Sequence, residues 1–259
     1  MSGSLSLWRR LLERCSHRRR IPDVLWLQTL HVLPFLRPWP VDDLLRLRHL
    51  AEQFLGKKEF SAAGGLTISD AMAVSIAAQA CLPVLRLGLT PYDAFVGIVV
   101  HPDEVVARRS VMDDDGIVHE YDEVLSGEAM EGGPVMLSWR DVEMSAEGSD
   151  SAYNVVIHEF AHVLDMGDGA PDGVPPLPSL AARREWMAVI DREFEAFRTA
   201  VDSGEETTLD PYGATSIDEF FAVASEAFFV TPVAMRHEHP ALYAQFAGYY
   251  RQDPAQHWR

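Results

Sequence analysis

Residues 155–165 read Val-Val-Ile-His-Glu-Phe-Ala-His-Val-Leu-Asp and contain an H-E-x-x-H pattern. Because three residues separate His158 from His162, the two imidazoles stand one turn apart on the same face of an α-helix. Two imidazoles in this arrangement can hold one Zn²⁺ from the same side, and Glu159 then lies close enough to act on a metal-bound water. The pattern therefore indicates a metal site on this helix.

The residues around the pattern favour a buried helix. Nearly all other residues of the stretch are apolar, which is typical of a helix enclosed by the protein core. Side-chain oxygens at Ser149, Asp150 and Ser151 indicate where the helix starts, and Gly167 indicates where it ends. The alternative interpretation is a core helix without a metal, in which the histidines are hydrogen bonded internally.

The composition is that of one large globular domain. The 259 residues are 47% hydrophobic and 24% charged, with a net charge of −17. Residues 1–20 carry six arginines against one glutamate, which predicts a basic, flexible arm ahead of a single domain at 21–259. Within that domain we expect a helical N-terminal part at 21–90 and a catalytic part at 91–259.

Charge and cysteine content exclude several classes of protein. The acidic body argues against direct binding of nucleic acid as the main function. The two cysteines, Cys15 and Cys81, provide neither a disulfide framework nor a cysteine-based metal site, which favours a cytoplasmic location. No apolar run approaches the length needed to cross a bilayer, so no membrane span is expected.

Hydrophobic periodicity and turn residues predict an α+β fold, because helices precede and follow a block of short strands. Besides the helix with the H-E-x-x-H pattern, the expected helices span residues 22–36, 41–55, 70–82, 181–201, 217–230 and 240–252. The expected strands span 58–60, 94–100, 105–112, 116–121 and 135–139, with the β-branched run at 94–100 as a central strand. Residues 167–179 hold three glycines and four prolines and are expected to form a loop.

A catalytic zinc ion takes three protein ligands and keeps a fourth position for water, so a third ligand is required. One possibility extends the histidine pattern to Asp168, as in metzincins. The glycine position of that longer pattern holds Asp165, however, and the turn glycine comes at 167, out of register. Asp165 itself either orients a histidine or caps the helix end.

The other possibility is a carboxylate from the helix predicted at 217–230. Glu219 and Glu226 stand seven residues apart on one face of this otherwise apolar helix. One of them can ligate the metal while the other hydrogen bonds to a ligand. Glu219 can instead close a capping box with Ser216, and Glu226 can be an exposed polar residue on a half-buried helix. The spacing alone leaves these alternatives open.

Three blocks of the chain together resemble the Mlc titration factor A family of zinc peptidases. They are Gly-Glu-Ala through Gly-Pro-Val-Met-Leu-Ser-Trp at 127–139, His-Glu-Phe-Ala-His-Val-Leu-Asp at 158–165, and the segment at 210–229 that opens Asp-Pro-Tyr-Gly-Ala-Thr. The likeness spans most of the chain after about residue 20. It implies a zincin-like domain with a small mixed sheet, related to the catalytic domain of anthrax lethal factor and classed as a gluzincin.

The resemblance assigns roles within the last block. It implies that Glu219 is the third zinc ligand and that Tyr212, seven residues earlier, assists catalysis. Glu226 then hydrogen bonds to a ligand. Gly213 departs from the family, in which alanine is usual, and we expect it to loosen the loop that holds Tyr212. Without the resemblance, Tyr212 can also be a core residue with a hydrogen-bonded hydroxyl.

The implied activity is hydrolysis of a peptide substrate at one zinc ion per chain, with aminopeptidase action as one form of it. Glu159 would serve as the general base, and Tyr212 would help to stabilise the oxyanion. The strand predicted around 135–138 either pairs with an extended peptide or is an ordinary strand of the sheet.

The resemblance also implies a second function. The named family member binds and sequesters the transcriptional repressor Mlc, which controls glucose uptake genes. The alternative is therefore a cytoplasmic regulator of sugar uptake that binds such a repressor without cleaving it. The basic arm at 1–20 and the loop at 167–179 are the candidate docking segments, although each can equally be a plain tail or connector.

Overall fold

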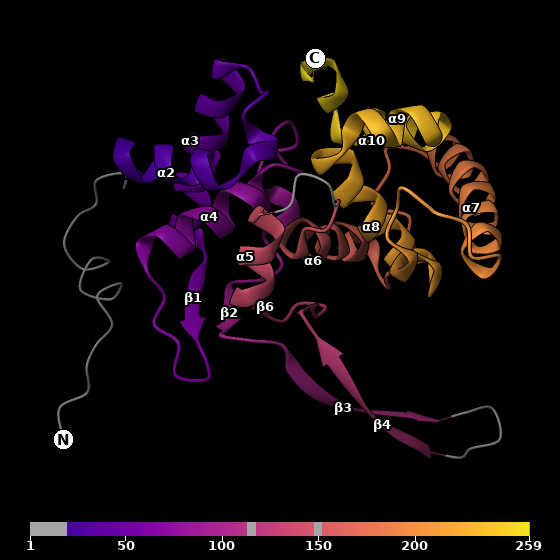
Figure 1. Cartoon of the computed structure of the whole chain (residues 1–259), viewed down its shortest axis with the longest axis horizontal. Helices are drawn as coiled ribbons and strands as arrows, with labels where there is room; N and C mark the ends of the chain where they lie inside the picture. Colours follow the sequence, from indigo (N-terminus) through magenta and orange to yellow (C-terminus); the bar gives the residue numbers. More distant parts are fainter. Residues whose placement is uncertain (1–19, 113–117, 148–151, 259) are drawn as a thin grey trace.

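The computed structural model describes residues 20–112, 118–147 and 152–258, and its fold is α+β as predicted. Helices from the two ends of the chain lie on either side of a central helix, α6 (Val155–Asp165), and a small sheet lies along one side (Figure 1). Residues 1–19 of the predicted basic arm lie outside the described residues. Within the described ranges, no helix is both long enough and apolar enough to cross a membrane.

A four-stranded mixed sheet forms one side of the molecule, with the strand order β1-β2-β6-β5. Strands β1 (Glu59–Ala62), β2 (Gly97–His101) and β6 (Val135–Ser138) are parallel, whereas β5 (Gly127–Ala129) runs antiparallel to β6. The β-branched run is therefore central, as predicted. Of the two alternatives for β6, an ordinary strand of the sheet is confirmed and pairing with a peptide is wrong, because β2 and β5 already occupy both of its edges. The edge strand on this side is β5.

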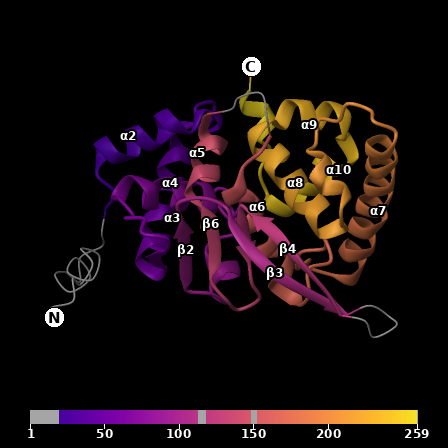
Figure 2. The ribbon, with the colours of Figure 1, turned by 60° about the horizontal axis from the view of Figure 1, so that its bottom comes forward.

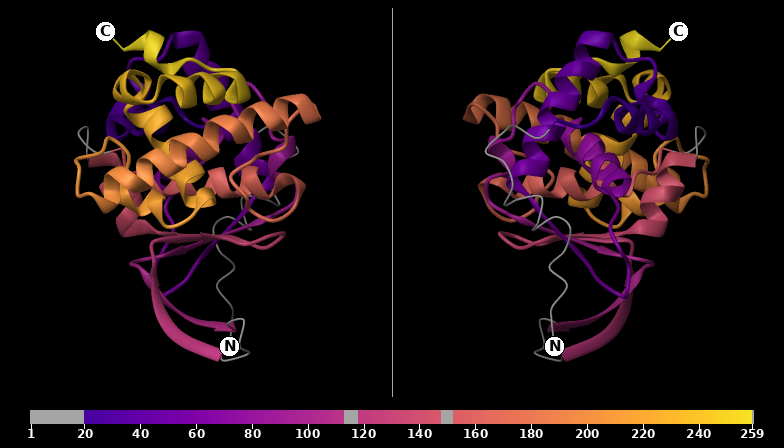
Figure 3. Two further views of the ribbon diagram at one scale, coloured as in Figure 1. Left: turned by 90° about the vertical axis from the view of Figure 1, so that its right-hand side faces the viewer. Right: turned by 90° about the vertical axis from the view of Figure 1, so that its left-hand side faces the viewer.

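A long β-hairpin stands apart from this sheet. It consists of β3 (Val105–Met112) and β4 (Val118–Leu125), which pair antiparallel as a separate two-stranded sheet. The hairpin extends away from the helices in both Figure 1 and Figure 3. The turn predicted between its strands falls largely on residues 113–117, outside the described ranges. The hairpin ends next to the edge strand, because only Ser126 separates β4 from β5.

The helices enclose α6. Those before it are α2 (Asp23–Val32), α3 (Val41–Lys57), α4 (Asp70–Cys81) and α5 (Trp139–Glu147); those after it are α7 (Leu180–Asp202), α8 (Ile217–Val230), α9 (Pro232–Glu238) and α10 (Pro240–Tyr250). Helix α6 packs against both α4 and α8 (Figure 2). Helix α8 is apolar nearly all round and is buried from Phe220 to Val230, which places it in the middle of the C-terminal helices.

The structure differs from the predicted elements at a few boundaries. The first helix ends at Val32 because the residue before a proline disfavours helical backbone, and Leu33 before Pro34 has φ −112° and ψ 80°. The strand predicted at 94–100 begins only at Gly97. Strand β5 and helix α5 were not predicted, since three and nine residues are too few to show a periodic pattern.

Candidate metal centre

Helix α6 starts at an asparagine cap. The side chain of Asn154 accepts a hydrogen bond from the backbone N–H of Ile157 at 2.9 Å, which satisfies one of the unpaired donors of the first turn. The predicted caps at Ser149–Ser151 lie outside the described residues, and the helix begins after them. It ends at Asp165, as the stop signal at Gly167 predicts, and a 3₁₀ turn over Met166–Asp168 follows.

Three side chains converge beside the first turns of α6 and α8. Oε2 of Glu219 lies 3.0 Å from Nε2 of His158 and 3.5 Å from Nε2 of His162, and the two Nε2 atoms are 3.2 Å apart. Among the described histidine, cysteine and acidic residues, these three form the group that can hold a metal ion. The structure thus brings together the three ligands expected from the sequence and the resemblance.

The arrangement fits a tetrahedral ion. Metal–ligand bonds of about 2.0–2.1 Å in tetrahedral geometry separate the donor atoms by roughly 3.3 Å, close to the three distances observed. Oε2 of Glu219 is also buried and faces the two Nε2 atoms, a position that suits an atom whose partner is an ion. Burial raises the pKa of the Glu219 carboxyl, but the two adjacent histidines outweigh burial and hold that pKa well below its ordinary value.

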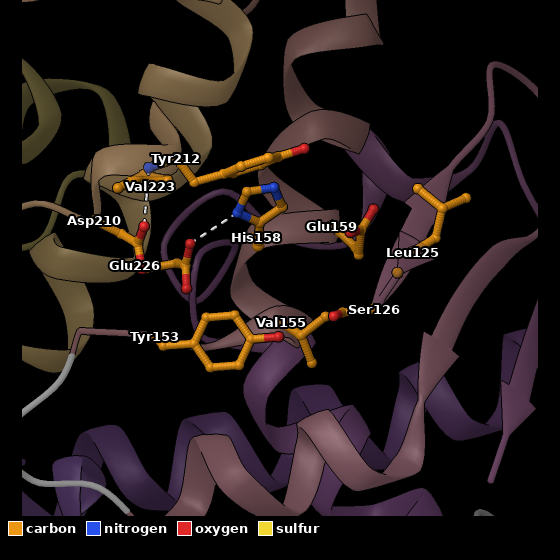
Figure 4. A pocket seen from close by; sticks show the side chains of 11 residues that line it. Leu125, Ser126, Tyr153, Val155, His158, Glu159, Asp210, Tyr212, Val223 and Glu226 are labelled. Carbon is orange, nitrogen blue, oxygen red and sulfur yellow. Dashed lines mark hydrogen bonds and ion pairs between the residues drawn. The ribbon is translucent and has the colours of Figure 1, made fainter. Parts of the chain in front are cut away.

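Glu226 fixes the orientation of His158. Its Oε1 lies 2.8 Å from Nδ1 of His158 (Figure 4). Its Oε2 accepts a hydrogen bond from the backbone N–H of Asn154. When Nδ1 carries the proton, Nε2 presents its lone pair to the ligand cluster. Glu226 is only 2% exposed, so the interpretation as an exposed surface residue is wrong.

Protons compete with a metal at His158. Burial lowers the pKa of its imidazole, but hydrogen bonds to Glu219 and Glu226 outweigh burial and raise that pKa well above its ordinary value. A metal ion requires the neutral imidazole, so metal binding at this centre must displace a proton.

Glu219 and Tyr212 come from neighbouring segments. Ser216 caps α8 without a side-chain hydrogen bond, so the capping-box interpretation of Glu219 is wrong. Tyr212 lies in the 3₁₀ turn η4 (Pro211–Ala214), where Asp210 accepts its backbone N–H at 2.9 Å. The Tyr212 hydroxyl lies 3.4 Å from Oε1 of Glu219, and the residue is 49% exposed. It is therefore no core residue but stands at the mouth of the centre.

Gly213 follows Tyr212 and is buried against α8. A β-carbon there would lie 3.2 Å from Cβ of Val223, a tight contact. The glycine thus allows close packing of η4 on α8, whereas the expected loosening of the loop stays a prediction.

Glu159 lies beneath the edge strand. Its side chain is buried, and burial raises the pKa of its carboxyl. Gly127 of β5 faces it so closely that a β-carbon at this glycine would lie 2.4 Å from Oε1 of Glu159. Sequence reasoning did not identify Gly127 as a site residue, because nothing in the local pattern distinguishes it from other glycines.

The two remaining acidic candidates face other partners. Asp165 is fully buried, and its Oδ2 accepts the backbone N–H of Gly173 at 2.8 Å, so it is directed at the loop after α6. Burial raises its pKa to about 6. Asp168, the metzincin alternative, lies 3.3 Å from the guanidinium of Arg183 and is not part of the ligand cluster.

Two hollows adjoin the ligand cluster along β5. One lies towards the start of α6, between apolar side chains of Leu125, Val155 and Val223, with Tyr153 beside them (Figure 4). The other adjoins His162 and is lined by acidic side chains that include Glu128 and Asp218. The centre is therefore open to a ligand larger than water.

Replacing Gly127 by alanine should displace Glu159, because the new β-carbon cannot share its space. We expect Gly127→Ala to reduce any hydrolytic activity at this centre by at least a hundredfold, with a circular dichroism spectrum like that of the wild type. Gly56→Ala is the matched control, since a β-carbon there meets nothing within 4 Å. Activity of Gly127→Ala within a few fold of the wild type would contradict the close contact.

Replacing Asp165 by asparagine should change how stability depends on pH. The folded pKa of about 6 exceeds the ordinary value of 3.8, so the wild type loses stability as pH rises from 3.8 through 6, by up to about 3 kcal/mol over the whole interval and about half of that above pH 5. The amide that replaces the carboxyl stays neutral and still accepts the Gly173 N–H. Chemical denaturation should show Asp165→Asn more stable than the wild type, with a gap that widens from pH 5 to pH 7.5. Asp191→Asn, at an exposed position, should show no such widening.

Comparison with known proteins agrees with this centre. The chain matches the family described as glucose-regulated metallo-peptidase M90 over residues 6–251. It is 37% identical to proteins named Mlc titration factor A of Edwardsiella ictaluri, covering 86% of each chain, and of Serratia proteamaculans, covering 86% of this chain and 85% of the relative. It is 35% identical to an uncharacterized protein of Synechocystis, covering 86% of this chain and 81% of the relative. The resemblance seen in the sequence is confirmed, and the chain belongs to the M90 family of glucose-regulated metallopeptidases.

Proposed function

We propose that this chain is a zinc peptidase with one zinc ion, held by His158, His162 and Glu219. The observation that carries the proposal is the convergence of their three donor atoms within 3.5 Å of one another. Two imidazoles and one carboxylate in tetrahedral arrangement, with room for water, are the ligand set of many catalytic zinc sites. When bound, zinc would lower the pKa of a water molecule towards about 7 and polarise the scissile carbonyl.

Two side chains would do the remaining chemistry. Glu159 accepts the proton of the attacking water and later delivers it to the leaving amine, two roles that suit a carboxyl whose pKa is raised by burial. The hydroxyl of Tyr212, at the mouth of the centre, donates a hydrogen bond to the oxyanion, which contributes roughly 3 kcal/mol in comparable sites.

An extended peptide would bind along β5. This strand is the edge of the sheet next to α6, and a peptide chain that pairs with it would extend the sheet. Leu125 to Ala129 also line the two hollows beside the ligand cluster, so side chains of a peptide on β5 have space on either side of Glu159.

The acidic hollow supports aminopeptidase action. Glu128 and Asp218 line it together with Glu159 and Glu219, so four carboxyl groups line the space next to His162. A free α-ammonium group is attracted to such a space, whereas a blocked amino terminus gains nothing from it. We therefore propose that the chain prefers substrates with a free amino terminus.

A second function is binding of a transcriptional repressor. Two of the relatives carry the name Mlc titration factor A, and the family is described as glucose-regulated. We propose that a repressor similar to Mlc binds this chain in the cytoplasm, in a regulatory circuit of sugar uptake. The proline-rich loop at 167–179 is our candidate docking segment, since its residues 169–179 connect the 3₁₀ turn at Met166–Asp168 to α7 without regular structure.

Glu159→Gln tests the peptidase and separates the two functions. The amide cannot accept the proton, so hydrolysis of a peptide should fall by about a thousandfold, within the range typical of general-base catalysis. Elemental analysis should still find one zinc ion per chain, and binding of a repressor should be unchanged. Glu185→Gln, exposed on α7, is the control. Full activity in Glu159→Gln, or a wild type that contains no zinc, would refute the proposed mechanism.

The end preference is testable with paired substrates. We expect kcat/KM for an amino acid 4-nitroanilide with a free amine to exceed that for its N-acetylated form by at least tenfold. Glu128→Gln should raise KM for the free amine, whereas Glu131→Gln, exposed on the turn after β5, should not. Equal cleavage of both forms would refute the aminopeptidase proposal while leaving the peptidase proposal intact.

A further inference from the structure

We infer that Asn154 and Gln79 are positioning residues of the metal centre. Together with Glu226 they form a buried, hydrogen-bonded chain that fixes the orientation of His158. The inference rests on the proposed zinc centre and extends it by two residues, neither of which belongs to the ligand cluster.

The chain begins with a polar residue in an apolar helix. Gln79 lies on α4, where it is completely buried, and a buried amide is costly unless its hydrogen bonds are satisfied. Its Nε2 donates to the backbone oxygen and to Oγ of Ser75, both at 3.3 Å, and its Oε1 accepts from Nδ2 of Asn154 at 2.8 Å. These partners leave the Gln79 amide only one orientation, with its oxygen towards Asn154.

Asn154 connects Gln79 to two parts of the centre. Because its Nδ2 is held by Gln79, its Oδ1 points to the N–H of Ile157 and caps α6, the helix that carries His158 one turn further on. In many helices the N–H of the cap residue is satisfied by an acidic side chain at the third helical position. Here that position is Ile157, which has no acceptor, so the cap N–H is left for Glu226 of α8.

Glu226 completes the connection. One of its carboxylate oxygens receives the N–H of Asn154, and the other lies 2.8 Å from Nδ1 of His158. The side-chain hydrogen bonds of Asn154 therefore hold its backbone in place at the start of α6, and that backbone carries the N–H that Glu226 accepts. Such outer partners of metal ligands typically change metal affinity by 10- to 100-fold when they are replaced.

Metal affinity is the measurement that separates positioning from simple packing. Asn154→Ser keeps an N-cap oxygen and the backbone N–H but removes the donor to Gln79. Gln79→Met keeps the length of the side chain and removes the acceptor. In the full chain, we expect each variant to raise the zinc dissociation constant about tenfold in competition with a chromogenic chelator. The visible spectrum of the Co²⁺ form should also shift.

The variant that combines Asn154→Ser with Gln79→Met, and a matched control, make the test more specific. Since both substitutions break the same hydrogen bond, the double variant should raise the dissociation constant by far less than a hundredfold. Ser225→Ala removes another buried hydrogen bond of α8, the one to the hydroxyl of Tyr250 at 2.7 Å, next to Glu226 in sequence. It should lower the melting temperature and leave the zinc dissociation constant within twofold of the wild type.

The outcomes are distinct. Zinc dissociation constants within twofold of the wild type and an unchanged Co²⁺ spectrum, in variants with lowered melting temperatures, would overturn the inference and leave the network a purely structural one. A wild type that binds no zinc would overturn the proposed function itself. If Asn154→Ser does not fold, Gln79→Met alone decides, because the cap remains intact in that variant.

Discussion

The structure depends on enclosing a polar helix face in an apolar core. Helix α6 packs against α4, α8 and β5, yet it carries His158, Glu159 and His162. Buried polar groups need hydrogen-bond partners, so the neighbouring helices have to place acceptors opposite the nitrogen atoms of the histidines. Helix α8 does so with two carboxylates seven residues apart: Glu219 meets Nε2 of His158, and Glu226 meets Nδ1 of the same ring. The seven-residue spacing of Glu219 and Glu226 on α8 thus matches the two nitrogen atoms of the His158 ring.

A second constraint acts from the sheet. The edge strand approaches α6 at Gly127, and the side chain of Glu159 occupies the space that any other residue would need. This contact buries the carboxyl between backbone and ligand cluster, and burial raises its pKa. The short strand β5 thus covers the side chain of Glu159 with its backbone and also forms the edge of the four-stranded sheet.

The sequence predicted the fold class, the main helices and the two histidines, because those signals are local and periodic. It could not separate Glu219 from Glu226, since residues seven apart share a helix face and only the packing shows that each takes a different nitrogen of His158. Resemblance to a family was needed there. Asn154 was overlooked in favour of the polar run before it. Gly127 begins one of the blocks that resemble the family, but its role could not be predicted, because the need for a glycine arises from Glu159, more than thirty positions away.

The N-terminal part of the chain supports the segments that hold the metal ligands. Its strand β1 pairs with β2 and completes the parallel portion of the sheet, and its helix α4 places Gln79 against the cap of α6. Removing that part would expose β2 as a new edge and leave the Asn154 amide without its acceptor. Both effects act on the segments that hold the metal ligands. The N-terminal part of the chain is therefore connected to the rest at the metal centre as well as in the apolar core.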